Sequence, residues 1–156
     1  MGSRFAKLPK PDMRKLMLMG RSGAGKTTLT QALRGDSIAY KKTQYVGYGD
    51  WLIDTPGEYI ETSRLGNALA LYAYEADVIG LLQAADEPYS LFPPNITCMV
   101  NREVIGIVTL RDGVSPDRAI RWLKISGCKK IFVVDSVSGD GIQELLDFLK
   151  KPSKNR

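Results

Sequence analysis

The segment from Gly20 to Thr27, GRSGAGKT, matches in full the pattern G-x-x-x-x-G-K-[ST] of a phosphate-binding loop. Glycines at these positions let backbone N–H groups turn toward a chain of phosphates, and the helix that follows presents its positive N-terminus to the same anion. Lys26 would reach the β and γ phosphates, and the Thr27 hydroxyl would bind Mg²⁺. The expected nucleotide-binding residues are Gly20, Arg21, Ser22, Gly23, Ala24, Gly25, Lys26, Thr27 and Thr28.

A second stretch, WLIDTPGE, can complete a nucleotide site from another strand. Its apolar residues predict a strand that delivers Asp54 at its carboxyl end, where a carboxylate can hold the outer shell of the metal ion. The Gly57 amide can sense a γ phosphate, and Thr43 is a candidate third metal ligand in a loop that orders around that phosphate. These features are typical of a GTPase switch; the alternatives are an ordinary turn and a surface threonine.

The catalytic step is predicted from what the chain contains and lacks. The sequence has no histidine, so catalysis must use carboxylates, backbone amides, lysine or a hard metal ion. Glu58 occupies the position where many GTPases place a glutamine that orients the attacking water. Because an ionised glutamate is repelled by a γ phosphate, we expect slow hydrolysis. The candidate catalytic residues are Lys26, Thr43, Gly57 and Glu58.

The segment TLRD, Thr109 to Asp112, stands where a guanine-reading N-K-x-D loop is expected. It keeps the aspartate, but Leu110 replaces the lysine whose stem covers the base, and Thr109 replaces the asparagine that ties loops together. Two hydrogen bonds from guanine to Asp112 would contribute roughly 1.5 to 3 kcal/mol each, and adenine lacks those donors. We therefore expect guanine to be preferred, with weak affinity. The alternative is that Asp112 only forms a turn before Gly113.

Two further contacts with the base are expected. Leu110 can pack on the base without supplying a charge, and the segment DSVSGDGI places Ser136 and Val137 where a second base-contacting loop would end.

Alternating strands and helices are predicted to position these residues. Apolar runs predict strands within 14–20, 77–85, 103–110 and 129–136, and two strands within 44–57 that form a hairpin through the Gly49-Asp50 turn. Helical spacing predicts helices within 26–35, 66–76, 115–127 and 141–151, the first ending at Gly35 and the third capped by Ser115. This order predicts an α/β three-layer sandwich with a mostly parallel sheet, as in P-loop NTPases of the small GTPase type.

Composition limits the classes of protein to consider. A chain of 156 residues with 44% hydrophobic content is expected to form one domain, over 13–151, with 1–12 as a cloning remnant or disordered extension and 152–156 as a basic tail. Most of the net charge of +5 lies in those two ends, which argues against a nucleic-acid-binding surface. Cys98 and Cys128 lack metal-ligand or disulfide spacing and are expected to be core thiols. The chain shows no signal peptide and no apolar run of roughly 18 to 20 residues, so a cytosolic protein without membrane contact is expected.

The segments GRSGAGKT, KKTQ and IDTPGEY resemble the small P-loop GTPase-like proteins of ethanolamine and propanediol utilisation, the EutP/PduV family. The resemblance covers residues 13–151, and the spacing from the phosphate loop to KTQ and DTPGEY is its selective part. It implies a bacterial cytoplasmic protein associated with microcompartments that process ethanolamine or propanediol. Mg²⁺ with GTP or GDP are the expected ligands, with ATP as the alternative, and a shell or pathway protein is the expected partner of a monomer or homodimer.

Three functional hypotheses remain open from the sequence. The first is a slow GTPase switch, indicated by Thr43 and Asp54 on either side of the phosphate loop. The second is a small phosphotransferase such as an acetate kinase, in which a carboxylate would replace water as the acceptor. The third is a binding module without turnover, which the altered TLRD segment and Glu58 both allow.

Overall fold

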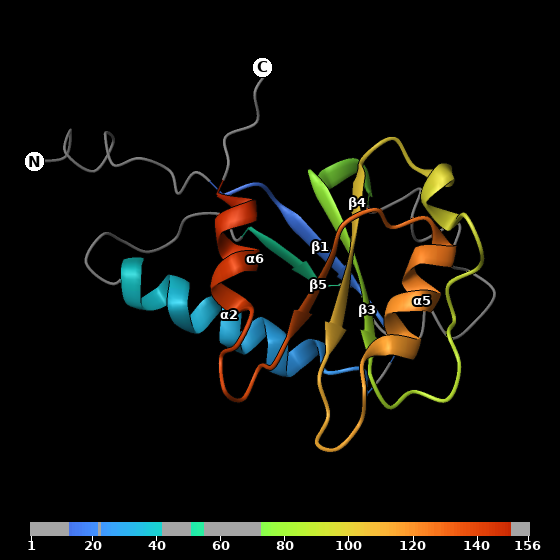
Figure 1. The fold of residues 1–156 in the computed structure, drawn as a ribbon. Helices are drawn as coiled ribbons and strands as arrows, with labels where there is room; N and C mark the ends of the chain where they lie inside the picture. The colour runs from blue at the N-terminus through green and yellow to red at the C-terminus, as the bar shows by residue number, and fades with distance from the viewer. Residues whose placement is uncertain (1–12, 22, 42–50, 55–72, 151–156) are drawn as a thin grey trace, which may run out of the picture.

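The computed structural model describes residues 13–21, 23–41, 51–54 and 73–150, which are drawn in colour in Figure 1. Continuous apolar runs form its strands, as expected for a sheet that is covered on both faces. The elements in chain order are β1 (Leu16–Met19), α2 (Lys26–Lys41), β2 (Leu52–Asp54), the 3-10 helix η1 (Ala73–Glu75), β3 (Val78–Ala84), the 3-10 helix η2 (Ile96–Met99), β4 (Glu103–Thr109), α5 (Asp117–Ser126), β5 (Ile131–Val134) and α6 (Ile142–Leu149).

The five strands form one sheet in the order β2-β1-β3-β4-β5, and every neighbouring pair is parallel. The chain leaves β1 toward β2 on one side of it and later returns to β3 on the other side. In open parallel sheets, ligands bind at such a reversal of strand order, beyond the carboxyl ends of the strands. The segment from Gly20 to Thr27, called the phosphate loop below, follows β1 at this place.

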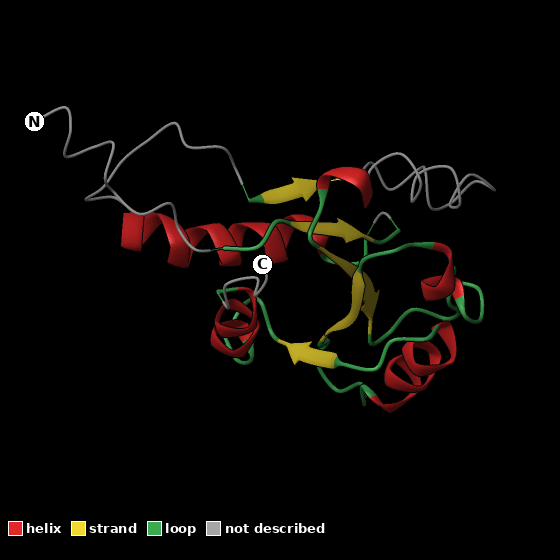
Figure 2. Cartoon of the chain, turned by 90° about the horizontal axis from the view of Figure 1, so that it is seen from above, coloured by secondary structure: helices red, strands yellow, loops and turns green. Residues whose placement is uncertain are grey.

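Helices cover both faces of the sheet, as Figures 1 and 2 show, with α2 and α6 on one side and α5 on the other. Leu29 and Leu33 of α2 and Leu145 and Leu149 of α6 are fully buried in one core against the sheet. On the opposite face, Leu123 of α5 belongs to the second core. The α/β three-layer sandwich predicted from the sequence is therefore confirmed, and its sheet is entirely parallel.

Glycine allows the closest contacts between these layers. A Cβ atom on Gly106 in β4 would stand 2.9 Å from Cδ1 of Leu123 in α5. A Cβ on Gly80 in β3 would stand 2.9 Å from Cδ1 of Ile107. Real Cβ atoms are not found at such distances, so these strand glycines set how closely α5 and β4 can approach their neighbours.

Several predicted boundaries differ from the structure. Helix α2 continues through Gly35 to Lys41, so the prediction that it ends at Gly35 was wrong. A helical glycine costs only about 1 kcal/mol, which the neighbouring residues can offset. The first strand of the predicted hairpin lies outside the described residues. So do residues 66–72 of the helix predicted within 66–76, and its residues 73–75 form η1. β2 itself pairs in parallel with β1.

Helix α5 begins one residue later than predicted, since Pro116 occupies the cap position. The predicted cap, Ser115, still accepts a hydrogen bond of 3.1 Å from the Asp117 N–H through its hydroxyl oxygen. The helix ends at Gly127, as predicted, because this residue takes a φ of 109° and its N–H closes the last turn.

The two cysteines lie in different environments. Cys128 is buried in the core, and burial raises the pKa of its thiol to about 12. Cys98 is exposed, so the prediction of a core thiol was wrong for this residue. It stands in η2, whose buried member is Ile96.

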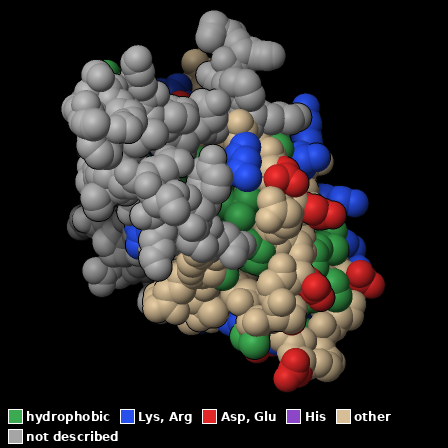
Figure 3. Space-filling view, turned by 90° about the vertical axis from the view of Figure 1, so that its left-hand side faces the viewer, with side chains coloured by type: hydrophobic (Ala, Val, Ile, Leu, Met, Phe, Trp, Pro, Cys, Tyr) green, Lys and Arg blue, Asp and Glu red, His purple; other side chains and the backbone are tan. Residues whose placement is uncertain are grey.

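Two surface properties bear on the expected partners. Figure 3 views the side where α2 and α6 lie in Figure 1, and acidic and basic side chains are interspersed over the described part of that face. Within the described ranges, no helix combines the length and apolar character that a bilayer span requires.

Candidate nucleotide site

The phosphate loop has the backbone conformation of an anion-binding turn. Gly23 and Gly25 have φ angles of 87° and 96°, a left-handed conformation that other residues rarely adopt. Successive N–H groups in such a turn point to one side and form a concave site for an anion. Helix α2 begins at Lys26 immediately afterwards, so its positive N-terminus adds to the attraction. The loop therefore fits a phosphate group.

Gly20 and Gly25 also fit the loop tightly against the neighbouring strands. A Cβ atom at Gly20 would approach the Leu82 carbonyl oxygen of β3 to 3.1 Å. A Cβ atom at Gly25 would stand 3.4 Å from the Thr109 side chain at the end of β4. The loop is thus fixed over the carboxyl ends of β3 and β4.

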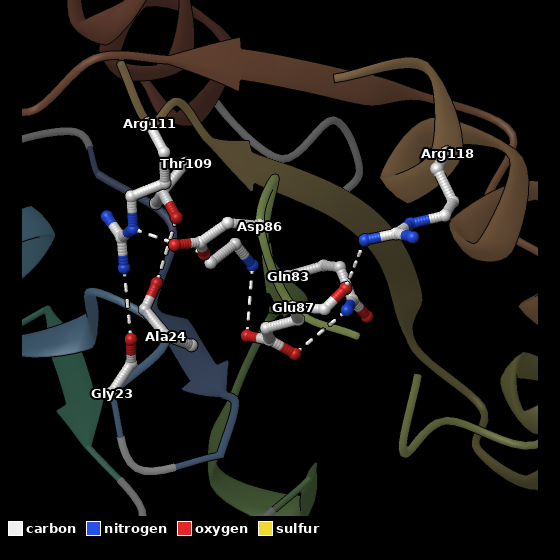
Figure 4. A network of polar contacts seen from close by, with 9 residues as sticks. Gly23, Ala24, Gln83, Asp86, Glu87, Thr109, Arg111 and Arg118 are labelled. Carbon is white, nitrogen blue, oxygen red and sulfur yellow. Dashed lines mark hydrogen bonds and ion pairs between the residues drawn. The ribbon is translucent and has the colours of Figure 1, made fainter. Parts of the chain in front are cut away.

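Residues 109–113, called the base loop below, are tied directly to the phosphate loop, as Figure 4 shows. The buried Thr109 hydroxyl donates a 2.8 Å hydrogen bond to the Ala24 carbonyl oxygen. Arg111 donates from Nη2 to the Gly23 carbonyl oxygen at 3.0 Å. Threonine therefore ties the two loops together here, the task that asparagine has in the N-K-x-D pattern.

The remaining base-loop residues form a tight turn. The Val114 N–H donates to the Arg111 carbonyl oxygen, and Gly113 takes a φ of 74° as such turns require. Asp112 lies exposed in this turn. The Leu110 N–H donates to the Val134 carbonyl oxygen at 2.9 Å, which joins the base loop to β5.

The loop from Asp135 to Gly141 follows β5 and lies next to the base loop in the sheet order. The Asp135 carboxylate accepts hydrogen bonds from the N–H groups of Ser138 and Val137, which lower its pKa. This carboxylate therefore organises the loop. Val137 is 91% exposed, and the Ser136 hydroxyl oxygen is buried without a hydrogen-bond partner among the described residues.

Two of the three predicted metal ligands fall within the described residues. Thr27 lies in the first turn of α2, and Asp54 ends β2 in register with Leu18 of β1. Thr27 comes after β1 and Asp54 is the last residue of the adjacent parallel strand β2, so both stand at the same edge of the sheet. Mg²⁺ is usually held by one or two protein oxygens together with substrate phosphates and waters, so this donor set fits that ion. Among the described residues, no group of three or more Cys, Asp or Glu side chains could hold a metal by itself.

Comparison with known proteins places this chain among relatives of similar length. The family model described as "Ethanolamine utilisation - propanediol utilisation" matches residues 13–151. The propanediol utilization protein PduV of Citrobacter freundii is 44% identical over 88% of this chain and 93% of that protein. This chain belongs to the PduV-EutP family.

Other PduV-EutP relatives are named differently. The protein called probable acetate kinase EutP of Escherichia coli K12 is 31% identical over 91% of this chain and 92% of that protein. Among solved structures, the FeoB G-domain of Methanococcus jannaschii is 20% identical, matches 86% of this chain and 94% of that chain, and has a TM-score of 0.57. The fold is therefore that of a GTPase G-domain.

Most of the site residues predicted from the sequence belong to the described structure of this PduV-EutP protein. One group of predicted residues lies beyond the carboxyl ends of the parallel strands: Gly20, Arg21, Gly23 to Thr28, Leu110, Asp112, Ser136 and Val137. Four predicted residues lie outside the described residues: Ser22, Thr43, Gly57 and Glu58.

A buried polar cluster at the end of β3, also shown in Figure 4, was not predicted from the sequence. Gln83 is fully buried and donates from Nε2 to Glu87 Oε1 at 2.8 Å. Glu87 Oε2 accepts the Ala84 N–H at 3.0 Å, and Arg118 of α5 donates to the Glu87 carbonyl oxygen at 2.8 Å. A glutamine inside an apolar strand, followed by two acidic residues, was the available signal, because buried polar groups must be paired.

This cluster reaches the phosphate loop through Arg21. Burial raises the pKa of the Glu87 carboxyl, although the Ala84 N–H and the positive charge of Arg21 oppose this shift. The Arg21 guanidinium carbon lies 5.0 Å from the centre of the ring of Tyr89, whose carbonyl oxygen accepts a hydrogen bond from Gln83 Nε2 at 3.3 Å. The cluster therefore connects β3, α5 and the second residue of the phosphate loop.

Proposed function

We propose that this protein binds a guanine nucleotide with Mg²⁺ and hydrolyses GTP slowly, as a switch in propanediol or ethanolamine utilisation. The observation that carries the proposal is the position of the phosphate loop at the reversal of strand order between β1 and β3, with the base loop tied to it. The kinship with the propanediol utilization protein PduV supports the metabolic setting. Under this proposal the protein acts in the bacterial cytoplasm, beside a microcompartment shell or pathway protein.

Each part of the site has a task in this proposal. The phosphate loop and Lys26 would hold the β and γ phosphates, and Thr27 with Asp54 and Thr43 would surround the metal ion. Mg²⁺ would supply charge neutralisation at the γ phosphate when bound. Asp112 would select guanine, because its carboxylate can accept two donors that adenine lacks. Ser136, whose buried hydroxyl oxygen has no hydrogen-bond partner in the described part of the chain, and Val137 would contact the base from the next loop.

Slow turnover is expected from Glu58 in place of a glutamine. A carboxylate next to the γ phosphate would be repelled by it, so it would position water poorly. Glu58→Gln is therefore expected to raise the rate of phosphate release, and an unchanged rate would remove Glu58 from the mechanism.

Phosphate transfer to acetate is the second candidate, because the EutP relatives carry the name probable acetate kinase. In that reaction an acetate oxygen would attack the γ phosphorus, the bond to the β-γ bridging oxygen would break, and the nucleoside diphosphate would leave. The buried carboxyl of Glu87 feels the positive charges of Arg21 and Arg111, and its own negative charge disfavours an acetate site beside it.

The test is calorimetric titration of the Mg²⁺-loaded protein with GTP, GDP and ATP, followed by product analysis with and without acetate. Asp112→Ala is expected to abolish the preference for guanine, whereas Asp147→Ala on α6 serves as the matched control. Phosphate as the only product would support the GTPase. Acetyl phosphate formation or equal affinity for ATP would overturn it in favour of the kinase, and bound GTP that survives for hours would favour a binding module.

A further inference from the structure

The phosphate loop has two successive carbonyl groups that accept hydrogen bonds from side chains outside the loop. A turn whose N–H groups face an anion directs its carbonyl oxygens away from that anion. The Ala24 carbonyl oxygen accepts from Thr109, and the Gly23 carbonyl oxygen accepts from Arg111 at 3.0 Å. Both donors come from the end of β4. The conformation of the phosphate loop therefore depends on side chains of the base loop.

Arg111 also contacts the loop after β3. Its Nε lies 3.4 Å from Asp86 Oδ1, while its Nη2 reaches Gly23, as Figure 4 shows. The guanidinium group is planar and rigid, so a carboxylate at Nε fixes the direction in which Nη2 points. This Arg111 bridge thus joins the segments that follow β1, β3 and β4 at the nucleotide edge of the sheet.

The position of this arginine in the motif is informative. The base loop carries Leu110 at the place of the lysine in N-K-x-D, and the positive charge stands one residue later. The contacts of Arg111 are with the backbone of the phosphate loop and with Asp86. A cation placed in this way acts on the phosphate end of the site and carries no information about the base.

We propose that Arg111 is a positioning residue that holds the phosphate loop in its anion-binding conformation before the nucleotide arrives, and that Asp86 acts through Arg111. This inference rests on the proposed nucleotide site. If the loop is held in the free protein, binding does not have to pay for ordering it. Loss of the bridge should therefore make the loop less ordered in the free protein. It should also lower the affinity for every phosphate-bearing ligand by a similar factor.

The experiment combines hydrogen exchange of the ligand-free protein with calorimetric titration by GDP, ADP and inorganic triphosphate. Arg111→Ala should raise the rate of hydrogen exchange in the peptide covering residues 20–27. It should also lower the affinity for all three ligands by roughly tenfold, the effect of one charge-assisted hydrogen bond. Arg121→Ala, which removes an exposed arginine of α5, is the matched control and should change neither quantity.

Two further variants separate positioning from a general loss of structure. Asp86→Ala should lower the affinity for the ligands less than Arg111→Ala does. The double variant should bind them no more weakly than Arg111→Ala alone, because Asp86 acts only through the arginine. Arg111→Lys should recover part of the affinity, since lysine can reach Gly23 but lacks the fork that contacts Asp86 at the same time.

The possible results distinguish this inference from the proposed function. Failure of the wild-type protein to bind any of the three ligands would overturn the proposed function, while the exchange measurement would still test the bridge in the free protein. Three results would each overturn the positioning role: an unchanged hydrogen-exchange rate in Arg111→Ala, losses of affinity from Asp86→Ala and Arg111→Ala that add up in the double variant, or a loss of affinity for GDP alone.

Discussion

The Thr109 hydroxyl donates a 2.8 Å hydrogen bond to the Ala24 carbonyl oxygen, joining the end of β4 to the phosphate loop across 85 residues of sequence. Both groups are buried, with Thr109 only 2% exposed and Ala24 fully inaccessible. A short hydroxyl therefore replaces a longer amide in the base loop. This is possible because Gly25 allows the two segments to come within van der Waals distance.

Thr109→Val is the direct test of this contact. Valine keeps the shape of threonine but removes the donor, which leaves the buried Ala24 carbonyl oxygen unpaired. We expect a loss of about 1–3 kcal/mol in the free energy of unfolding and weaker binding of GDP. Thr109→Ser, which keeps the hydroxyl, should bind GDP nearly as well as the wild type. Equal affinities for the serine and valine variants would show that the hydroxyl does not support the loop.

The buried carboxyl of Glu87 predicts a dependence of stability on pH. Its pKa is raised above the ordinary value of 4.5, mainly by burial, so the folded state binds this proton more tightly than the unfolded state. The free energy of unfolding contributed by this group therefore falls as pH rises from 4.5 through the folded pKa. Glu87→Gln removes this titration.

Urea unfolding of both proteins from pH 4.5 to neutrality measures the effect. The free energy of unfolding of Glu87→Gln, relative to that of the wild type, should increase as pH rises. A loss that does not depend on pH is added to this difference, because the new amide faces the Gln83 donor. Neighbouring charges on Asp86, Arg21 and Arg111 are present in both proteins, so they largely cancel in the difference. Two parallel stability curves would contradict the raised pKa.

A pair of glycine substitutions tests the packing of the layers. Gly106→Ala would place a methyl group 2.9 Å from Leu123 Cδ1 and 3.2 Å from Ile131 Cγ1, so we expect a loss of about 1–3 kcal/mol in the free energy of unfolding. Gly35→Ala meets no atom within 4 Å on the exposed side of α2 and should gain roughly 0.5–1 kcal/mol from helix propensity. Thermal unfolding of the two variants should thus shift in opposite directions; destabilisation by Gly35→Ala would argue against a helix through residue 35.

The cysteines should differ in reactivity. Thiolates react with iodoacetamide, and burial raises the pKa of Cys128 to about 12, whereas Cys98 is exposed. Mass spectrometry should find one adduct, on Cys98, in the folded protein and two adducts after unfolding in urea. Cys98→Ser should prevent labelling of the folded protein. Labelling of Cys128 at a similar rate to Cys98 in the folded state would show that this part of the core opens readily.

Local signals in the sequence were sufficient for the elements and for the phosphate-binding motif. Apolar runs and helical spacing are local properties of the chain, so the strands predicted within 14–20, 77–85, 103–110 and 129–136, the end of α5 at Gly127 and the α/β class followed from them. The GRSGAGKT motif spans only the consecutive residues 20–27 and is recognised from them and from the elements that flank it. The prediction at Gly35 failed because a weak local preference is overridden when the surrounding helix packs on the sheet.

Only the tertiary structure decided which distant groups meet at the edge of the sheet. Sequence spacing does not reveal that Arg111 contacts Gly23 and Asp86, or that Gln83 and Glu87 pair inside the protein. These contacts arise because the parallel order β1-β3-β4 brings the carboxyl ends of strands that are far apart in sequence to one edge. The sequence by itself determined the phosphate-binding chemistry, whereas the arrangement of strands determined which side chains hold that loop in place.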